Sequence, residues 1–280
     1  MYKKTCIIIS GATASGKTDH AIDLATKHQT QIISADSRQC YEELNIGVAK
    51  PSRQQLHSVH HYFIDSHSIH EEVNVKTFEQ YALNAVKKIF EKNDVAIVAG
   101  GTGLYIKAFC EGLDDVPEVN EDIRQEIFTS YQLCGLKWLR HQLEKYDAEY
   151  VISGEMQNPQ RMMRALEVKL STGISILKFQ TGKKIKRDFE IKNIYLNVPR
   201  NELYERINRR VDLMMNAGLL NEAKALYDYR NLNALQTVGY KELFDFMEGK
   251  TSLDKAIDEI KKNTRHYAKR QITWFKRQMI

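Results

Sequence analysis

Short apolar runs, each about as long as a buried strand, recur along this chain and are separated by amphipathic stretches. The runs lie at residues 5–10, 31–35, 95–99 and 193–198. Residues 77–92 place apolar side chains at i, i+3, i+4, i+7 and i+8, which predicts an amphipathic helix. Strands that alternate with helices are typical of an α/β protein. We therefore predict a parallel sheet flanked by helices.

The middle of the chain has a different pattern. Residues 117–187 are polar and rich in helical spacing, and they contain no strand-like run. Pro117 and the basic run at 183–187 mark the two ends of this stretch. We therefore predict a helical insertion domain over residues 117–187, and a core that is formed by residues 1–116 together with residues 188–280.

The first apolar run leads directly into a glycine-rich stretch. This stretch consists of Gly11, Ala12, Thr13, Ala14, Ser15, Gly16, Lys17 and Thr18. The pattern G-x-x-x-x-G-K-[ST], after a strand and before a helix, is that of a phosphate-binding loop. Its backbone amides and the helix N-terminus attract an anion, Lys17 adds a mobile positive charge, and Thr18 is placed to hold Mg²⁺. The stretch predicts a site for a polyphosphate, as in nucleotide-binding proteins, without indicating which one.

The ends of two other predicted strands carry candidate chemistry. The run at 31–35 ends in Asp36, and ligands of an open parallel sheet sit outside the carboxyl ends of its strands. Asp36 is therefore expected beside the phosphate loop, although a turn or cap residue is the alternative. The run at 95–99 ends in small residues and Thr102, where phosphate-loop NTPases usually carry an aspartate. This ending argues against NTP hydrolysis.

The positive charge of the chain is concentrated at one end. The net charge is +5 overall, but residues 255–280 alone carry +6, so that the other residues sum to −1. Aromatic side chains, among them Tyr267 and Trp274, are interleaved with the basic ones. A basic helix on a nearly neutral body suggests a polyanionic partner. A solvated helix face is the alternative.

A pair of arginines precedes this basic helix. Arg206 and Arg210 share one face of a predicted helix at i, i+4 spacing. Near a phosphate loop, two such arginines can clamp a leaving group. A surface pair is the alternative, and the sequence leaves open which of the two would contact a diphosphate.

Histidines and cysteines point to no metal centre. Five histidines lie in one segment, at His57, His60, His61, His67 and His70. The i, i+4 spacing of His57 and His61 could suit a metal, but the segment has no clear helical periodicity, and mixed surface and packing roles are expected. The four cysteines form no C-x-x-C pair, which argues against a common zinc motif and gives no disulfide framework.

The cellular setting follows from what the sequence lacks. No apolar run approaches the roughly 20 residues of a membrane span. The short apolar run near the N-terminus is too short for a signal peptide. We therefore expect a cytoplasmic protein with no membrane contact, no protein partner is implied, and a monomer is the default expectation.

Several of these stretches together resemble the tRNA dimethylallyltransferase (isopentenyltransferase) family. The matching stretches are residues 11–18, 34–39, 100–107, 160–167, 238–242 and 269–275. The phosphate loop is shared with thousands of NTPases, but the second and third stretches in this order and spacing are specific. Because the chain ends soon after the basic helix, it resembles the short bacterial form without a C-terminal zinc finger.

The resemblance implies a reaction. The donor would be dimethylallyl diphosphate, and the acceptor would be the exocyclic amine of adenosine at tRNA position 37, next to the anticodon. The loop Gly11–Thr18, with Arg210, would bind the diphosphate, and Thr18 would hold Mg²⁺. Asp36 would be the general base, with Lys17 and Thr102 also in the catalytic centre.

The resemblance also implies an RNA-binding set. Residues that would contact tRNA are Asp36, Ser37, Arg38, Gln39, Thr102, Arg124, Gln160, Arg161, Met162, Met163 and Arg164, and on the basic helix Lys269 and Arg270. The chain departs from the family at Ala12 and Ile174, where proline is usual. Ala12 occupies a free position of the loop pattern, so that phosphate binding is expected to survive.

Two other classes of function compete with this one. A small-molecule kinase also has a phosphate loop, and some kinases carry an aspartate after the second strand. The ending of the third strand, the size of the insertion and the basic terminal helix fit a kinase poorly. A non-enzymatic RNA-binding module is the other alternative. The sequence does not indicate which tRNAs are modified or how strictly the length of the donor is selected.

Overall fold

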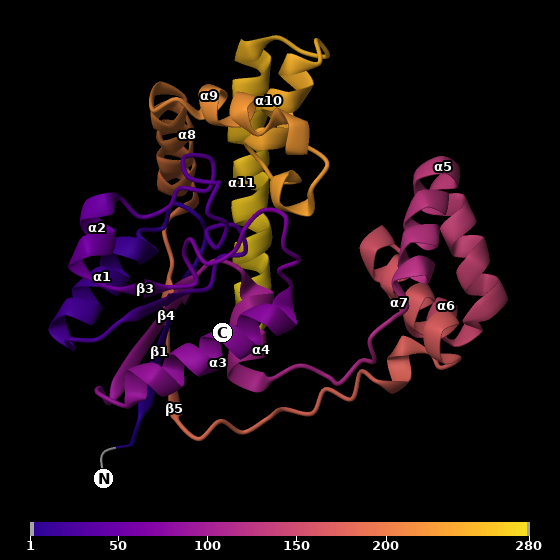
Figure 1. Ribbon diagram of the computed structural model, residues 1–280, viewed down its shortest axis with the longest axis horizontal. Helices are drawn as coiled ribbons and strands as arrows, with labels where there is room; N and C mark the ends of the chain where they lie inside the picture. The colour runs from indigo at the N-terminus through magenta and orange to yellow at the C-terminus, as the bar shows by residue number, and fades with distance from the viewer. Residues whose placement is uncertain (1–2, 279–280) are drawn as a thin grey trace. The chain divides into compact units, whose positions relative to one another are not determined.

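The computed structural model describes residues 3–278, which form two compact units (Figure 1). One unit combines residues up to Gly112 with residues from Lys186 onward, and the other is Leu113–Ile185. The predicted bounds of the insertion, 117 and 187, each lie a few residues too late.

The side chains at the two boundaries explain this difference. Asp114 accepts hydrogen bonds from the Thr181 hydroxyl and the Gly182 amide, which ties both connecting segments into the insertion. Arg187 is held by the core instead, because its guanidinium donates to the carbonyls of Ala108 and Phe109 and pairs with Glu79. The basic run at 183–187 therefore does not belong to one unit.

Within the described residues, the first unit contains one parallel sheet of five strands. The strands are β1 (Thr5–Gly11), β2 (Ile32–Ser34), β3 (His61–Tyr62), β4 (Val95–Gly100) and β5 (Glu190–Leu196), in the order β3-β2-β4-β1-β5. The predicted parallel sheet is confirmed. The two-residue strand β3 was not predicted, because it is too short to give a pattern and lies in the histidine-rich segment.

The strands read as continuous apolar runs because helices cover both faces of the sheet. Ile7 and Ile9 pack with α1 (Lys17–Lys27) on one face. Cys6 and Ile8, which alternate with them, pack on the opposite face in the larger core cluster. The helices α3 (Val75–Phe90) and α4 (Gly103–Glu111) belong to that second face. Figure 1 shows α1 and α3 on either side of the strands.

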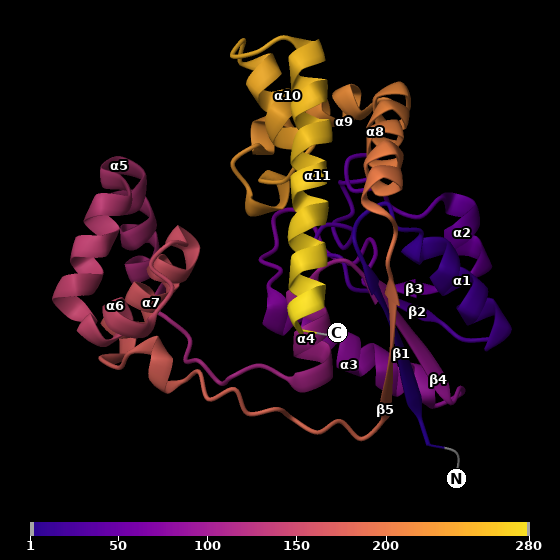
Figure 2. The same ribbon diagram turned by 180° about the vertical axis from the view of Figure 1, so that it is seen from behind.

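This unit also contains the short helix α2 (Arg53–Ser58), between β2 and β3, and four helices that follow the last strand. They are α8 (Arg200–Asn216), α9 (Leu219–Ala225), α10 (Tyr240–Met247) and α11 (Leu253–Gln278), with short 3-10 turns at Tyr227–Tyr229 and Asn233–Leu235. The long helix α11 contacts α10, α8, β1 and α4 in turn (Figure 2). One face of α11 is therefore buried along its length, with Ala256, Ile260, Ala268, Gln271 and Phe275 inside.

The second unit is helical, with its own core. It contains α5 (Glu121–Tyr146), α6 (Ala148–Ser153), α7 (Pro159–Thr172) and a 3-10 turn at Ile176–Lys178. Leu139 and Leu143 of α5 pack against Met162 and Leu166 of α7. Gly135 interrupts α5 with a φ of +70°, a left-handed value that favours glycine. Within the described part of the chain, no helix is long and apolar enough to cross a membrane.

Candidate active site

The phosphate loop connects the end of β1 to the start of α1. Gly16 stands at the N-cap of α1 with a φ of +88°, which a residue with a side chain rarely adopts. The loop closes on itself, since the Ser15 amide donates to the Ala12 carbonyl at 3.3 Å and Lys17 Nζ donates to the same oxygen at 2.5 Å. The amides at the start of α1 are left for an anion.

A cavity of about 310 Å³ opens above this loop. Loop residues 13–19 line one side, and the other sides are formed by Asp36, Lys50, Arg210, Tyr267 and Gln271, among others. The structure thus brings together Lys17, Thr18, Asp36 and Arg210, as the sequence predicted. Three cationic side chains around amide donors make this cavity a site for an anion.

Lys17 lies close enough to its charged neighbours for its pKa to respond to them. Burial lowers the pKa of Lys17 to about 8, Asp36 acts in the opposite direction, and Arg210 lowers the pKa further. Burial also lowers the pKa of Arg210, against the effect of Asp19 and Asp36. Lys17 is therefore only partly charged in the free protein just above neutral pH.

The affinity for a diphosphate is therefore expected to fall as the pH rises through about 8. A bound anion favours the charged form of Lys17. Above the Lys17 pKa of about 8, the free protein must therefore take up a proton when the anion binds. This uptake lowers the affinity by up to about tenfold for each further pH unit. Calorimetric titration with dimethylallyl diphosphate between pH 7 and about 9.5 measures this effect. The Lys17→Arg variant is the control, because arginine stays charged; a slope equal to that of the wild type would contradict the assignment to Lys17.

Asp36 has two roles in the geometry. Its Oδ1 accepts the amides of Arg38, at 2.9 Å, and Gln39, at 3.3 Å, so that it caps a turn as the alternative interpretation proposed. It also lines the cavity above the phosphate loop. Both amides use the same carboxylate oxygen, which leaves Oδ2 available to accept a proton.

Thr102 and Tyr267 form a pair of hydroxyls beside Asp36. Thr102 Oγ1 accepts the Ser37 amide at 3.1 Å, and Thr102 is one of the groups that act on the pKa of Tyr267. Burial and then Asp36 raise the pKa of Tyr267 to about 12, so that the phenol keeps its proton at neutral pH. Sequence reasoning identified Thr102 but treated Tyr267 only as an aromatic residue in the basic helix.

Gln271 links two loops of the site and was not predicted. Its Oε1 accepts the Thr13 amide of the phosphate loop, and its Nε2 donates to the Gly101 carbonyl after β4, each at 2.8 Å. Gln271 follows Tyr267 by one helical turn of α11, so both point from the same helix face. A polar residue on the otherwise apolar face of the basic helix is the signal that could have identified it.

A second, smaller cavity of about 120 Å³ adjoins the first. The two share Thr13, Asp36, Arg210 and Tyr267, together with Val48 and Ala49. The second cavity has a more apolar lining, to which Val211, Met214, Leu219, Val238 and Ile260 contribute. Asp36 therefore stands between a polar, cationic chamber and an apolar one.

Other predicted residues of this unit lie around the two cavities. Arg38 lines the apolar cavity, whereas the Gln39 side chain is occupied within the protein by the Ser34 hydroxyl and by the carbonyls of Val48 and Ala49. Arg206 pairs with Glu202 on the exposed side of α8, and Arg210 faces the site, 3.5 Å from the Thr13 hydroxyl. Of the two arginines, Arg210 lines the cavity, and Arg206 Nη1 would lie 4.0 Å from a Cβ on Gly16 of the loop, so which of them contacts a diphosphate stays a prediction.

The histidine-rich segment does not assemble a cluster. The His57 ring contacts the Arg53 carbonyl, and the His61 ring contacts the Val59 carbonyl. Within residues 3–278 no group of three or more histidine, cysteine or acidic side chains is arranged to hold a metal ion. His57 belongs to the short helix α2, which the sequence pattern did not indicate.

The predicted RNA contacts of the insertion need one correction. The Met162 and Met163 side chains are 0% and 4% exposed in the core of this unit, so they do not form part of an RNA-binding surface. Gln160 and Arg161 precede them on α7 and are exposed. Arg124 and Arg164 are partly buried and both lie against Glu167.

These features first define a class. A parallel sheet with a phosphate loop between β1 and α1, and a carboxylate after β2, is a P-loop NTPase-like α/β fold. Residues 39–278 match the family model described as IPP transferase. The chain belongs to the IPP transferase family.

Individual relatives agree with this assignment. The tRNA dimethylallyltransferase of Christiangramia forsetii is 47% identical over 271 residues, which cover 97% of this chain and 90% of that protein. That of Flavobacterium johnsoniae is 46% identical and covers 98% and 91%. The solved full-length tRNA isopentenylpyrophosphate transferase of Bacillus halodurans has a TM-score of 0.71 and 36% identity, covering 99% of this chain and 88% of that one.

A more distant structure is also similar. A eukaryotic dimethylallyltransferase acting on tRNA has a TM-score of 0.81 and 28% identity, and the likeness covers 97% of this chain and 70% of that one. The fold is therefore shared with a eukaryotic dimethylallyltransferase as well as with a bacterial enzyme.

Proposed function

We propose that this protein is a tRNA dimethylallyltransferase. It transfers the dimethylallyl group from dimethylallyl diphosphate to the exocyclic amine of adenosine at tRNA position 37, and diphosphate leaves. The observation that carries the proposal is the position of Asp36, between a cationic chamber for a diphosphate and an apolar chamber for a short hydrocarbon. A kinase is not favoured, because its phosphate acceptor would need a polar chamber.

The leaving group is stabilised by the cationic chamber. As the C–O bond of the allylic donor breaks, negative charge develops on the diphosphate, and the loop amides, Lys17 and Arg210 surround that position. The Ser15 hydroxyl is buried without a partner in the described structure, so its proton is available to a bound oxyanion. The Thr18 hydroxyl would hold Mg²⁺ together with oxygens of the diphosphate, and the ion would neutralise part of the diphosphate charge.

Asp36 acts on the acceptor. The lone pair of the adenine amine is spread into the ring, which makes it a poor nucleophile. As the N–C bond forms, the amine loses a proton to the free carboxylate oxygen of Asp36, and the N–H bond breaks. Tyr267 and Thr102 stand beside this carboxylate as neutral hydroxyls.

The apolar chamber holds the five-carbon group of the donor. Its aliphatic lining excludes water from the allylic carbon, which protects the developing cation from hydrolysis. A base that reaches this carbon must leave the anticodon-loop stack, at a cost of a few kcal/mol. Contacts between cationic side chains and RNA phosphates offset that cost.

A single incubation tests the function. The protein is mixed with dimethylallyl diphosphate, Mg²⁺ and tRNA, and the RNA is digested to nucleosides for mass spectrometry. The proposal requires an adenosine that carries one added C5H8 unit and one diphosphate released per adduct. Consumption of ATP with a phosphorylated small molecule would show a kinase, and tight tRNA binding without product would show a binding module.

The basic face of α11 is expected to contact RNA phosphates. Lys269 and Arg270 are exposed on the helix that carries Tyr267 and Gln271 inward. Replacing both with glutamine should weaken tRNA binding and lower the slope of log K against log salt by about 1.5. Filter binding between 50 and about 300 mM salt measures the slope.

A charge-matched control separates local contacts from net charge. Lys87 and Lys88 are exposed on α3, and their replacement with glutamine removes the same charge from another surface. That variant should bind tRNA with the slope of the wild type. If both double variants lower the slope equally, the basic face of α11 has no specific role.

A further inference from the structure

The wall between the two cavities is a loop held from outside the phosphate-binding core. Residues 45–50 form it, and Val48 and Ala49 line both cavities. Ala49 has a φ of +51°, so the loop is held in a conformation that alanine disfavours. Such a conformation persists only where surrounding contacts determine it.

One carboxylate provides most of the contacts at the start of this loop. Glu222 of α9 accepts three consecutive backbone amides, those of Asn45 at 3.2 Å, Ile46 at 2.8 Å and Gly47 at 2.9 Å. It also accepts the Tyr240 hydroxyl at 2.6 Å. A carboxylate that receives four hydrogen bonds is a strong, directional anchor.

Tyr240 restricts the position of the loop sterically, in addition to the hydrogen bonds to Glu222. It is fully buried, and a Cβ placed on Gly47 would lie 2.6 Å from its ring. The loop backbone therefore rests directly on the Tyr240 ring, and only glycine allows this approach. Glu222 and Tyr240 together fix the loop from the side of α9 and α10.

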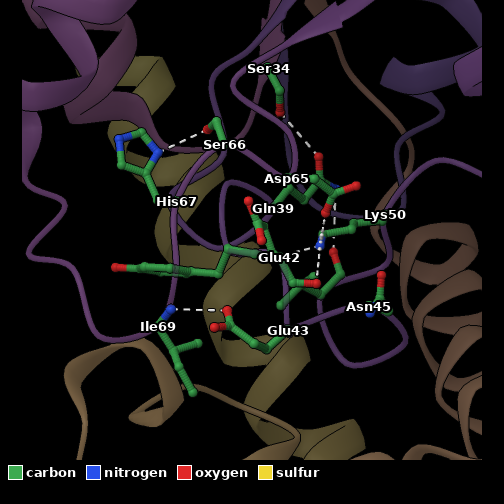
Figure 3. A network of polar contacts seen from close by, with 12 residues as sticks. Ser34, Gln39, Glu42, Glu43, Asn45, Lys50, Asp65, Ser66, His67 and Ile69 are labelled. Carbon is green, nitrogen blue, oxygen red and sulfur yellow. Dashed lines mark hydrogen bonds and ion pairs between the residues drawn. The ribbon is translucent and has the colours of Figure 1, made fainter.

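The opposite end of the loop is fastened independently. Lys50 Nζ donates to the Tyr41 carbonyl. It also pairs with Asp65, as Figure 3 shows. Gln39 donates to the carbonyls of Val48 and Ala49. Loss of Glu222 would thus leave Lys50 in the cationic chamber and would free the Asn45–Gly47 end of the loop, where Gly47 lines the apolar chamber.

We infer that Glu222, braced by Tyr240, is a positioning residue that sets the size of the apolar chamber and thereby the length of the prenyl donor. It touches neither donor nor acceptor; it acts through the backbone of residues 45–47. This inference rests on the proposed function, since it assigns the apolar chamber to the hydrocarbon of the donor.

The test compares donors of different length. For Glu222→Gln, one loop amide would face an NH₂ group in place of an acceptor, so kcat/KM with dimethylallyl diphosphate should fall roughly tenfold or more. The ratio of kcat/KM for dimethylallyl over geranyl diphosphate should fall as well, because the wall retreats. The Kd for inorganic diphosphate should stay within about twofold, since the phosphate loop is unchanged.

Two further variants keep the test decisive if Glu222→Gln folds poorly. Gly47→Ala displaces the same loop without changing Glu222, because the added Cβ would meet the Tyr240 ring, and it should lower the same ratio. Tyr240→Phe keeps the ring and removes one hydrogen bond, so a smaller change in the same direction is expected. A merely structural role would lower the Tm of these variants without changing donor selectivity.

A second tyrosine–glutamate pair in the same unit supplies the control. Tyr227 donates to Glu248 at 3.4 Å, away from the loop, so Tyr227→Phe and Glu248→Gln should leave selectivity unchanged. If the loop variants have the selectivity of these controls, the inference is overturned. A wild type that transfers no prenyl group from any donor would overturn the proposed function instead. The two failures are therefore distinguished by the activity of the wild type.

Discussion

Replacement of Asp36 with asparagine is expected to lower the rate of prenyl transfer by about 10²–10⁴-fold, the usual contribution of a general base. Asparagine has the same shape, and its Oδ1 can still accept the amides of Arg38 and Gln39, so the turn should persist. The ability to take the proton is removed, together with the negative charge that raises the pKa of Lys17, and saturating donor offsets the latter effect. Single-turnover kinetics with saturating donor and tRNA measure the loss directly.

The affinity for tRNA distinguishes a base from a binding residue. Asp36→Asn should bind tRNA within about threefold of the wild type, because the removed charge repels RNA phosphates rather than attracting them. Asp147→Asn is the matched control, since Asp147 caps α6 through the Tyr150 amide in the other unit. A large loss of tRNA affinity with an intact chemical rate would make Asp36 a binding residue.

The phosphate loop and Asp36 could be predicted because their signals are local. The loop is a continuous motif, and the position of Asp36 follows from the rule that ligands sit at the carboxyl ends of parallel strands. The strand order was not needed for either prediction. The phosphate loop and Asp36 line the same cavity in the structure.

Gln271, Tyr267 and Glu222 could not be predicted in the same way. Each lies far along the chain from the loop that it contacts, and each is carried by a helix whose pattern records only burial. The hydrogen bond from the Thr13 amide to Gln271, for example, joins residues 258 positions apart. Long-range contacts of this kind depend on the packing of α9 and α11, which periodicity does not specify.

The two methionines of α7 show the opposite error. The stretch 160–164 was treated as one RNA-binding motif, but a helix divides its residues between two faces. Met162 and Met163 face the core of the insertion, whereas Gln160 and Arg161 face solvent. Helical spacing separates the two groups, because Met162 and Leu166, at i and i+4, share the buried face.

The glycines at the end of β4 belong to the stretch 100–107 that resembles the family, and the structure gives them a packing role. A Cβ on Gly101 would lie 2.3 Å from Gln271 Nε2, and one on Gly103 would lie 2.3 Å from the Trp274 ring. These two glycines admit side chains of α11. Gly100 differs, because its neighbour is the backbone of Ala35.

Gly100→Ala is therefore expected to destabilise the protein by about 3 kcal/mol or more. The new Cβ would lie 2.1 Å from the Ala35 carbonyl oxygen, and this oxygen also accepts the Thr102 amide. The backbone of β2 must move, and since Ala35 precedes Asp36, the carboxylate moves with it. Urea unfolding measures the stability, and kcat at a temperature where the variant is folded measures the displacement.

Two other glycines distinguish steric contact from backbone strain as the cause of the expected destabilisation. Gly103→Ala should cost less than Gly100→Ala, because the Trp274 side chain can shift where a strand backbone cannot. Gly182→Ala tests backbone strain alone: its φ is +64° and nothing lies within 4 Å of the added Cβ, so about 1 kcal/mol is expected. If Gly100→Ala were no more destabilising than Gly182→Ala, close contact between β2 and β4 would not be what requires glycine there, and the position of Asp36 would not depend on it.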